Sequence, residues 1–118
     1  MLVLICGDRN WTDKQAIERE FIQHGLDPSR DTIMHGRASG ADTLAGNIGK
    51  ERGFPVRSYP AQWHIHGRAA GPIRNKLMLD QNPDLVLAFH PDITKSKGTG
   101  HMVRIARAKG VETEVFNA

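Results

Sequence analysis

The sequence predicts an α/β fold: a doubly wound, parallel, five-stranded sheet with helices on both faces. Short β-like runs alternate with longer helix-like runs along the chain, and two of the short runs, Leu2–Cys6 and Leu85–Phe89, are apolar throughout. Such runs are typical of strands buried on both faces. Regular alternation with helical crossovers implies parallel strands. Since the two most apolar strands belong side by side at the centre, we expect the strand order 3-2-1-4-5.

The first strand stops at Gly7, and a helix is predicted from about residue 13 to residue 24. Thr12 and Gln15 have the spacing of a capping box, in which each side chain bonds the other residue's backbone N–H. Ile17 and Phe21 fall on one face of this helix. That face should pack on the sheet.

The remaining strands are predicted from short apolar or alternating runs, and the remaining helices from the helical spacing of apolar residues. Further strands are predicted at Thr32–His35, Phe54–Tyr59 and Val111–Val115, and further helices over residues 41–53, from Pro72 to about residue 81, and over residues 98–109. The segment 61–71 between the third strand and its helix is polar and reads as a long loop. The last strand alternates Val and Thr with Glu, which is typical of an edge strand with one wet face.

Length and composition bound the functions open to the chain. Its 118 residues suit one domain, with 39% hydrophobic and 25% charged residues, near the averages for globular proteins. No apolar run approaches the roughly 20 residues of a membrane span. One cysteine cannot form an internal disulfide, so we expect a cytoplasmic protein. The formal charge of +3 favours anionic partners only modestly.

Loops that follow the first four strands meet at one edge of the predicted sheet, where ligands bind in such folds. Glycine backbones, helix N-termini and arginine side chains together suit phosphate groups. The loops therefore predict a pocket for a phosphorylated nucleotide or a related molecule. We expect it to be lined by Gly7, Arg9, Trp11, His35, Gly36, Arg37, Ser39, Gly40, Asp42, Trp63, Arg74, Asn75, His90, Lys97, Gly98 and Thr99.

Several familiar sites are missing from the sequence. It contains neither G-x-G-x-x-G after the first strand nor G-x-x-x-x-G-K-[ST] anywhere, which argues against ordinary dinucleotide and P-loop sites. His64 and His66 could approach a metal together, but no second cysteine or carboxylate cluster completes a ligand set. We expect no metal and no cofactor.

The loop motifs, in this order, resemble the YspA/YpsA-related branch of the SLOG superfamily. They are G-D-R-x-W-T-D, H-G-x-A-x-G-A-D, P-A-x-W, G-x-A-A-G-P-I-R-N-x-x-M and K-G-T-x-H-M, and they run from Gly7 to Met102. The resemblance implies a single SLOG-like, Rossmann-like domain over residues 1–118. It also implies ligands drawn from nucleotides, nucleotide-derived signals or nucleic acids, and a bacterial or phage origin.

Two groups of SLOG relatives sharpen this expectation. Lonely-guy-type phosphoribohydrolases use R-[KN]-x-x-M and G-G-x-G-T-x-x-E motifs; the first is matched here by Arg74–Met78, whereas Met102 stands at the glutamate of the second. A thioether can neither stabilise an oxocarbenium-like centre nor activate water. The resemblance therefore implies a phosphate cradle without the catalytic carboxylate. DprA-type relatives bind single-stranded DNA, and the basic loops keep that alternative open.

Our first hypothesis is a non-catalytic protein that senses, carries or sequesters a nucleotide-derived ligand. Asp42 and Asn75 would position donors, and Trp11 or Trp63 would stack on the base. Phosphate or ribose oxygens would be held by Arg9, Arg37, Arg74, Gly98 and Thr99. The alternatives are a nucleoside-monophosphate N-glycosidase using Asp8 or Asp42, and a single-stranded nucleic-acid binder.

Simple packing offers competing interpretations of single residues. Trp11 could be a hydrophobic staple beside the first helix, Trp63 could cover the sheet edge, and Arg74 could form an ion pair with Asp80. We also expect a homodimer or larger homo-oligomer, because the first helix carries three apolar residues that a solvated face would not need: Phe21, Ile22 and Leu26.

Overall fold

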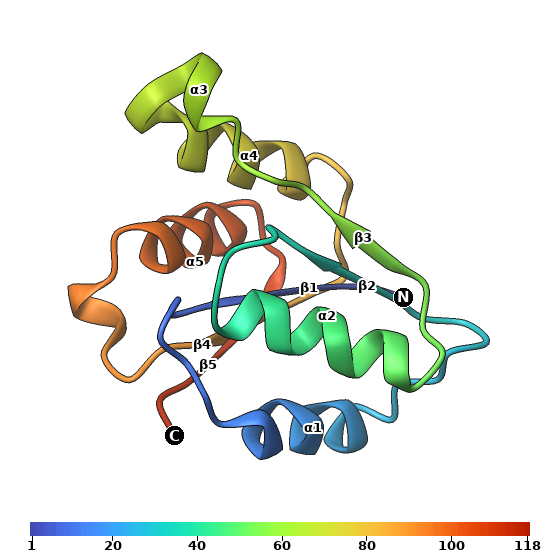
Figure 1. Ribbon diagram of the computed structural model, residues 1–118. Helices are drawn as coiled ribbons and strands as arrows, with labels where there is room; N and C mark the ends of the chain where they lie inside the picture. Colours follow the sequence, from blue (N-terminus) through green and yellow to red (C-terminus); the bar gives the residue numbers. More distant parts are fainter.

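The computed structural model describes residues 1–118 and confirms the predicted α/β architecture. Five parallel strands form one sheet in the order β3-β2-β1-β4-β5, with helices on both faces (Figure 1). The strands are β1 (Leu2–Gly7), β2 (Thr32–His35), β3 (Val56–Ser58), β4 (Leu85–Phe89) and β5 (Glu112–Phe116). The helices are α1 (Lys14–Gln23), α2 (Ala41–Glu51), α3 (Trp63–His66), α4 (Ala70–Leu79) and α5 (Gly98–Ala108), with short 3₁₀ turns η1 (Gly67–Ala69) and η2 (Ile93–Lys95).

The two apolar strands lie at the centre of the sheet, as their composition predicts. β1 pairs with β4 from Val3 opposite Leu85 to Gly7 opposite Phe89, and with β2 on its other edge. All five residues of β4 are buried. The chain reverses its winding direction between β1 and β4, so the switch point opens at the carboxyl ends of these two strands.

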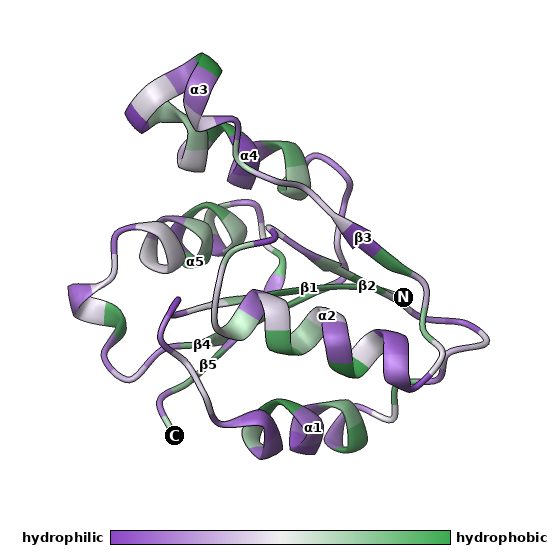
Figure 2. Cartoon of the chain, viewed as in Figure 1, coloured by the Kyte–Doolittle hydropathy of each residue, from purple (hydrophilic) through white to green (hydrophobic).

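Alternate residues of the central strands feed two separate cores. On one face Val3 and Ile5 pack with α1 and α2, and on the other Leu4 and Cys6 pack with α4 and α5. Figure 2 shows hydrophobic colouring concentrated along the central strands. This three-layer packing fixes the start of each long helix near the carboxyl edge of the sheet, where the loops of interest lie.

Two local predictions are wrong. The cap of α1 is Asp13, whose carboxylate accepts a 3.1 Å hydrogen bond from the N–H of Ala16, and the predicted capping box of Thr12 and Gln15 does not form. Aspartate caps a helix as well as threonine does, so the choice depended on where the chain turns. The segment predicted as a loop contains α3 and η1, and α4 begins at Ala70, ahead of Pro72.

The surface of α1 also differs from the expectation. Phe21 is 2% exposed and packs edge-on against Phe54, whereas Ile22 is 71% exposed. The first helix therefore presents one strongly exposed apolar side chain. More of them lie on α3 and α4: Trp63, Ile65, Ile73 and Leu77. Figure 1 shows α3 projecting from the body of the molecule beside α4. None of the helices has the length and apolar character needed to cross a bilayer.

Candidate functional site

The loop after β2 is folded around a buried carboxylate. Asp42, in the first turn of α2, is 4% exposed, and its Oδ2 accepts hydrogen bonds from the N–H of Gly36 at 2.9 Å and of Ala38 at 3.4 Å. Burial raises the pKa of Asp42 to about 6, against the opposing effects of these two N–H groups and of the nearby Arg74 charge. The Asp42 carboxylate therefore holds the backbone of this loop in its conformation.

Arg74 reaches this loop from the opposite layer of the fold. It lies in α4, half-buried, and its Nη1 donates to the carbonyl oxygen of Gly36 at 2.5 Å, while its Nε donates to Oδ1 of Asn75 at 3.0 Å. No carboxylate oxygen lies within 4.0 Å of the guanidinium, so the expected competitor Asp80 does not pair with it. The charge is held in place without being neutralised.

Asn75 extends the network to α5. It is 5% exposed, and its Nδ2 lies 3.2 Å from the carbonyl oxygen of Gly98, to which it donates, and 3.1 Å from Nδ1 of His101. Burial, and to a smaller extent the charge of Arg104, lowers the pKa of His101. A neutral imidazole can accept from the amide. Gly36, Arg74, Asn75 and Gly98 thus form one connected array that joins the loop after β2, helix α4 and the start of α5.

His35 supports the same loop from beneath. Its Nδ1 accepts from the N–H of Arg37 at 2.9 Å, and the residue is 7% exposed. Burial lowers the pKa of His35, helped by the charges of Lys50, Arg37 and Arg74. Arg37 itself has a φ of 57° and an exposed side chain. The hydrogen bond through His35 therefore helps to hold a left-handed turn that places Arg37 at the surface.

The loop after β1 packs directly on the start of α2. Gly40 has a φ of 72°, and a Cβ there would lie 2.5 Å from the carbonyl oxygen of Arg9. The N–H of Ala41 donates to the carbonyl oxygen of Asp8 at 3.2 Å. Glycine is needed at position 40 for this close approach. Arg9 and Ser39 remain exposed beside it, and Gly7 pairs with Phe89 at the end of β1.

The two tryptophans differ sharply. Trp11 is 8% exposed, its ring centroid lies 5.7 Å from that of Phe89, and its Nε1 donates to the carbonyl oxygen of Asp13 at 2.9 Å. The packing interpretation accounts for all these contacts. Trp63 is 59% exposed on α3. Trp63 is therefore the tryptophan that lies open to solvent.

The loop after β4 contributes less to the array. His90 uses its Nδ1 to accept from the N–H of Asp92 at 3.0 Å, and Lys97 and Gly98 are exposed at the start of α5. Thr99 is 9% exposed and Met102 is fully buried in the core under α5. Position 102 therefore faces the sheet and not the loops.

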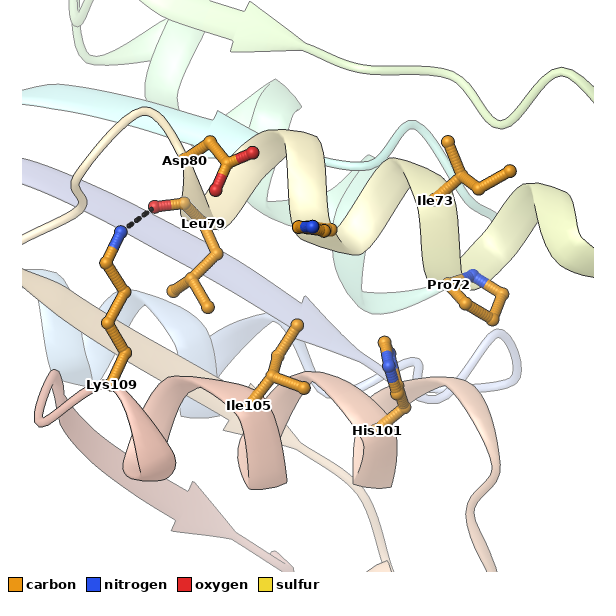
Figure 3. Close-up of a pocket in the computed structure, with 8 residues that line it drawn as sticks. Pro72, Ile73, Leu79, Asp80, His101, Ile105 and Lys109 are labelled. Carbon is orange, nitrogen blue, oxygen red and sulfur yellow. Dashed lines mark hydrogen bonds between the residues drawn. The ribbon is translucent and has the colours of Figure 1, made fainter.

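Two hollows lie near these loops. One, of about 220 Å³, opens at the carboxyl ends of β1 and β4 beside Asp8, Trp11 and Pro91. The other, of about 510 Å³, is a groove between α4 and α5 (Figure 3). His101 marks one end of the groove, and Lys109 closes the other by donating to the carbonyl oxygen of Leu79 at 3.0 Å. His101 was not among the residues expected to line the site, yet it lines the groove and contacts Asn75 of the array. Its place in the K-G-T-x-H-M motif was the sequence signal that could have identified it.

Comparison with known proteins gives three findings. A family model described as the YspA, cpYpsA-related SLOG family matches residues 1–66. The Gene 61 protein of Mycobacterium phage D29 is 33% identical over 120 aligned positions, which cover 92% of this chain and 90% of that protein. No solved structure matches the chain.

Proposed function

The chain belongs to the YspA, cpYpsA-related SLOG family, and on that premise we propose that it binds a nucleotide or nucleotide-derived ligand at the carboxyl edge of its sheet, without turning it over. Membership of the family suggests nucleotide-related ligand binding or processing. The choice of binding over processing, and of this edge as the place, rests on the residues of the array.

The observation that carries the proposal is the state of Arg74. Two hydrogen bonds fix its guanidinium, yet no carboxylate within 4.0 Å neutralises it. A half-buried, oriented and unneutralised guanidinium is suited to a bidentate contact with phosphate. Leaving such a charge without a partner costs free energy that an anionic ligand would recover.

Helix starts around Arg74 favour the same kind of ligand. Neither α2 nor α4 has a side chain capping its first turn, whereas α1 is capped by Asp13. α2 follows β2 directly, whereas α4 follows α3 and η1 and reaches the carboxyl edge through the contact of Arg74 with Gly36. The helix dipole attracts anions to an N-terminus. Arg9, Arg37 and Lys97 are exposed in the segments that follow β1, β2 and β4 and would add positive charge.

The carboxylates argue for binding without turnover. Met102 occupies the position of the glutamate in phosphoribohydrolases and is fully buried. Asp42, with its pKa of about 6, could in principle exchange a proton, but its Oδ2 accepts from two backbone N–H groups of the loop that encloses it. An N-glycosidase would need Asp42 released from these contacts.

The deciding experiment combines ligand-dependent stabilisation with a search for products. The protein is heated with a panel of nucleoside mono-, di- and triphosphates, cyclic nucleotides and dinucleotides, and each mixture is then separated by chromatography. We expect one ligand class to raise the melting temperature and to be recovered intact. Release of free base would establish the N-glycosidase alternative.

An oligonucleotide arm tests the nucleic-acid alternative. Affinity for single strands that falls steeply with salt, without any response to small nucleotides, would replace our proposal by single-stranded nucleic-acid binding. Exposed Trp63 on α3 would then be the first residue to test, because stacking on an aromatic ring is the common recognition mode for single strands.

A further inference from the structure

Three potential metal ligands meet between α1 and β5, in a cluster that the proposed function does not use. Glu20 and His24 lie one helical turn apart at the end of α1, and Glu114 projects toward them from β5. One ligand atom from each residue lies within 4.8 Å of the others. Nε2 of His24 is 2.8 Å from Oε2 of Glu114 and 3.7 Å from Oε1 of Glu20.

Two buried polar atoms of this cluster have no hydrogen-bond partner in the protein. Nε2 of His24 and Oε2 of Glu114 are buried, and the angles between them do not make a hydrogen bond despite their separation. Glu20 is 8% exposed and takes part in no side-chain hydrogen bond. Buried polar atoms normally have partners, and a buried carboxylate without one is costly. These atoms are therefore available to a further binding partner.

We propose that Glu20, His24 and Glu114 bind a divalent transition-metal ion of the zinc type. Imidazole nitrogen and carboxylate oxygen are zinc ligands at about 2.0–2.2 Å, which puts tetrahedral ligand atoms about 3.4 Å apart. The separations of 2.8 and 3.7 Å lie on either side of that value. Small side-chain movements would form the site.

Charge balance at the two glutamates favours a divalent ion. The two carboxylates carry two negative charges, which one divalent ion cancels. The carbonyl groups at the C-terminal end of α1 add to the negative potential at His24. The Glu114 side chain is 37% exposed, so the ion and completing water molecules have a route from solvent.

A metal here would be structural. It would join the edge strand β5 to α1, elements that meet across one face of the sheet, and it would stabilise the end of the chain at residues 112–116. A site with three protein ligands leaves one position for water. Its location in the α1 layer, apart from Arg74 in α4, makes this site independent of the proposed ligand function.

The test uses the full chain, stripped with a chelator and dialysed. Zn²⁺ is titrated by calorimetry, and thermal unfolding is recorded with and without Zn²⁺; Co²⁺ absorption reports coordination by nitrogen and oxygen. We expect one ion per chain and a higher melting temperature. Glu114→Gln and His24→Gln should each weaken Zn²⁺ binding by at least about tenfold, since each removes a ligand. Circular dichroism identifies any variant that fails to fold. Glu114→Gln is expected to disturb the fold less than His24→Gln, because the Glu114 side chain is more exposed.

The matched control is the double variant His64→Gln/His66→Gln. These two histidines are exposed on α3 and could each bind Zn²⁺ adventitiously. The control variant should keep the one-to-one site and its thermal stabilisation. The proposal is overturned if Zn²⁺ fails to bind stoichiometrically, if folded Glu114→Gln binds as the parent protein does, or if the control variant loses the site.

Discussion

Arg74 donates a hydrogen bond to the carbonyl oxygen of Gly36, a residue 38 positions earlier in the chain. The bond joins the loop after β2 to the first half of α4 and so joins two layers of the fold at the carboxyl edge. A Cβ at position 36 would lie 2.7 Å from Cζ of Arg74, so the contact depends on glycine.

Replacement of Arg74 tests the proposed phosphate contact. Arg74→Ala should weaken binding of the stabilising nucleotide by about 2–4 kcal/mol, because a charge-assisted, bidentate contact is lost. Arg74→Lys should restore only part of the affinity, since an ammonium group lacks the planar fork. Calorimetric titration measures both. An Arg74→Ala protein that melts early yet binds normally would show that the residue is structural.

Gly36→Ala should act through Arg74. The nearest atoms to the added methyl group belong to the flexible end of the arginine side chain, so we expect the guanidinium to move while the fold persists. Ligand affinity should fall, and the melting temperature without ligand should change little. Gly98→Ala adds a methyl group that meets no atom within 4 Å, so it shows the effect of the same change at another residue of the array while Arg74 stays in place.

The pH dependence of stability should reveal the buried carboxyl of Asp42. Because its pKa rises from 3.8 to about 6 on folding, the folded protein favours the protonated form. The associated stability is present below pH 3.8 and is lost as the pH rises through about 6. The full effect is about 3 kcal/mol at 1.36 kcal/mol per pKa unit.

Asp42→Asn isolates this contribution, since asparagine keeps a carbonyl acceptor but cannot ionise. Denaturant unfolding of both proteins from pH 4 to pH 7.5 should show Asp42→Asn gaining stability relative to the parent as the pH rises. The lowered pKa values of His35 and His101 work in the opposite direction, because their contribution to stability is lost as the pH falls. They are common to both proteins and cancel in the difference. A pH-independent difference would contradict the assignment.

Self-association remains a prediction, but the surface expected to mediate it is no longer that of α1. Phe21 is buried, and the exposed apolar side chains lie mainly on α3 and α4. We expect light scattering at micromolar concentration to find particles larger than the 13.1 kDa monomer. Trp63→Ser with Leu77→Ser should shift the population toward monomers, whereas Ile22→Ser should not. A 13.1 kDa particle for the parent protein would exclude a stable oligomer under these conditions.

The sheet was predictable because its signals are local. Continuous apolar runs distinguish β1 and β4 from the other strands. Such runs are buried on both faces only at the centre of a parallel sheet. The helices on either side follow from apolar spacing, as Ile17 and Val103 illustrate. The gathering of Gly36, Asp42, Arg74 and Gly98 at one edge then follows from parallel topology alone.

Packing and side-chain direction were decided only by the tertiary structure. Sequence could not choose between Thr12 and Asp13 as the cap of α1, nor show that Trp11 is enclosed while Trp63 stands free. The meeting of His24 with Glu114, 90 positions later, also has no local signal. Whether a side chain is buried, and which hydrogen bonds it makes, depends on the helix or strand that packs against it. That helix or strand is distant in the sequence, so the local pattern carries no signal of it.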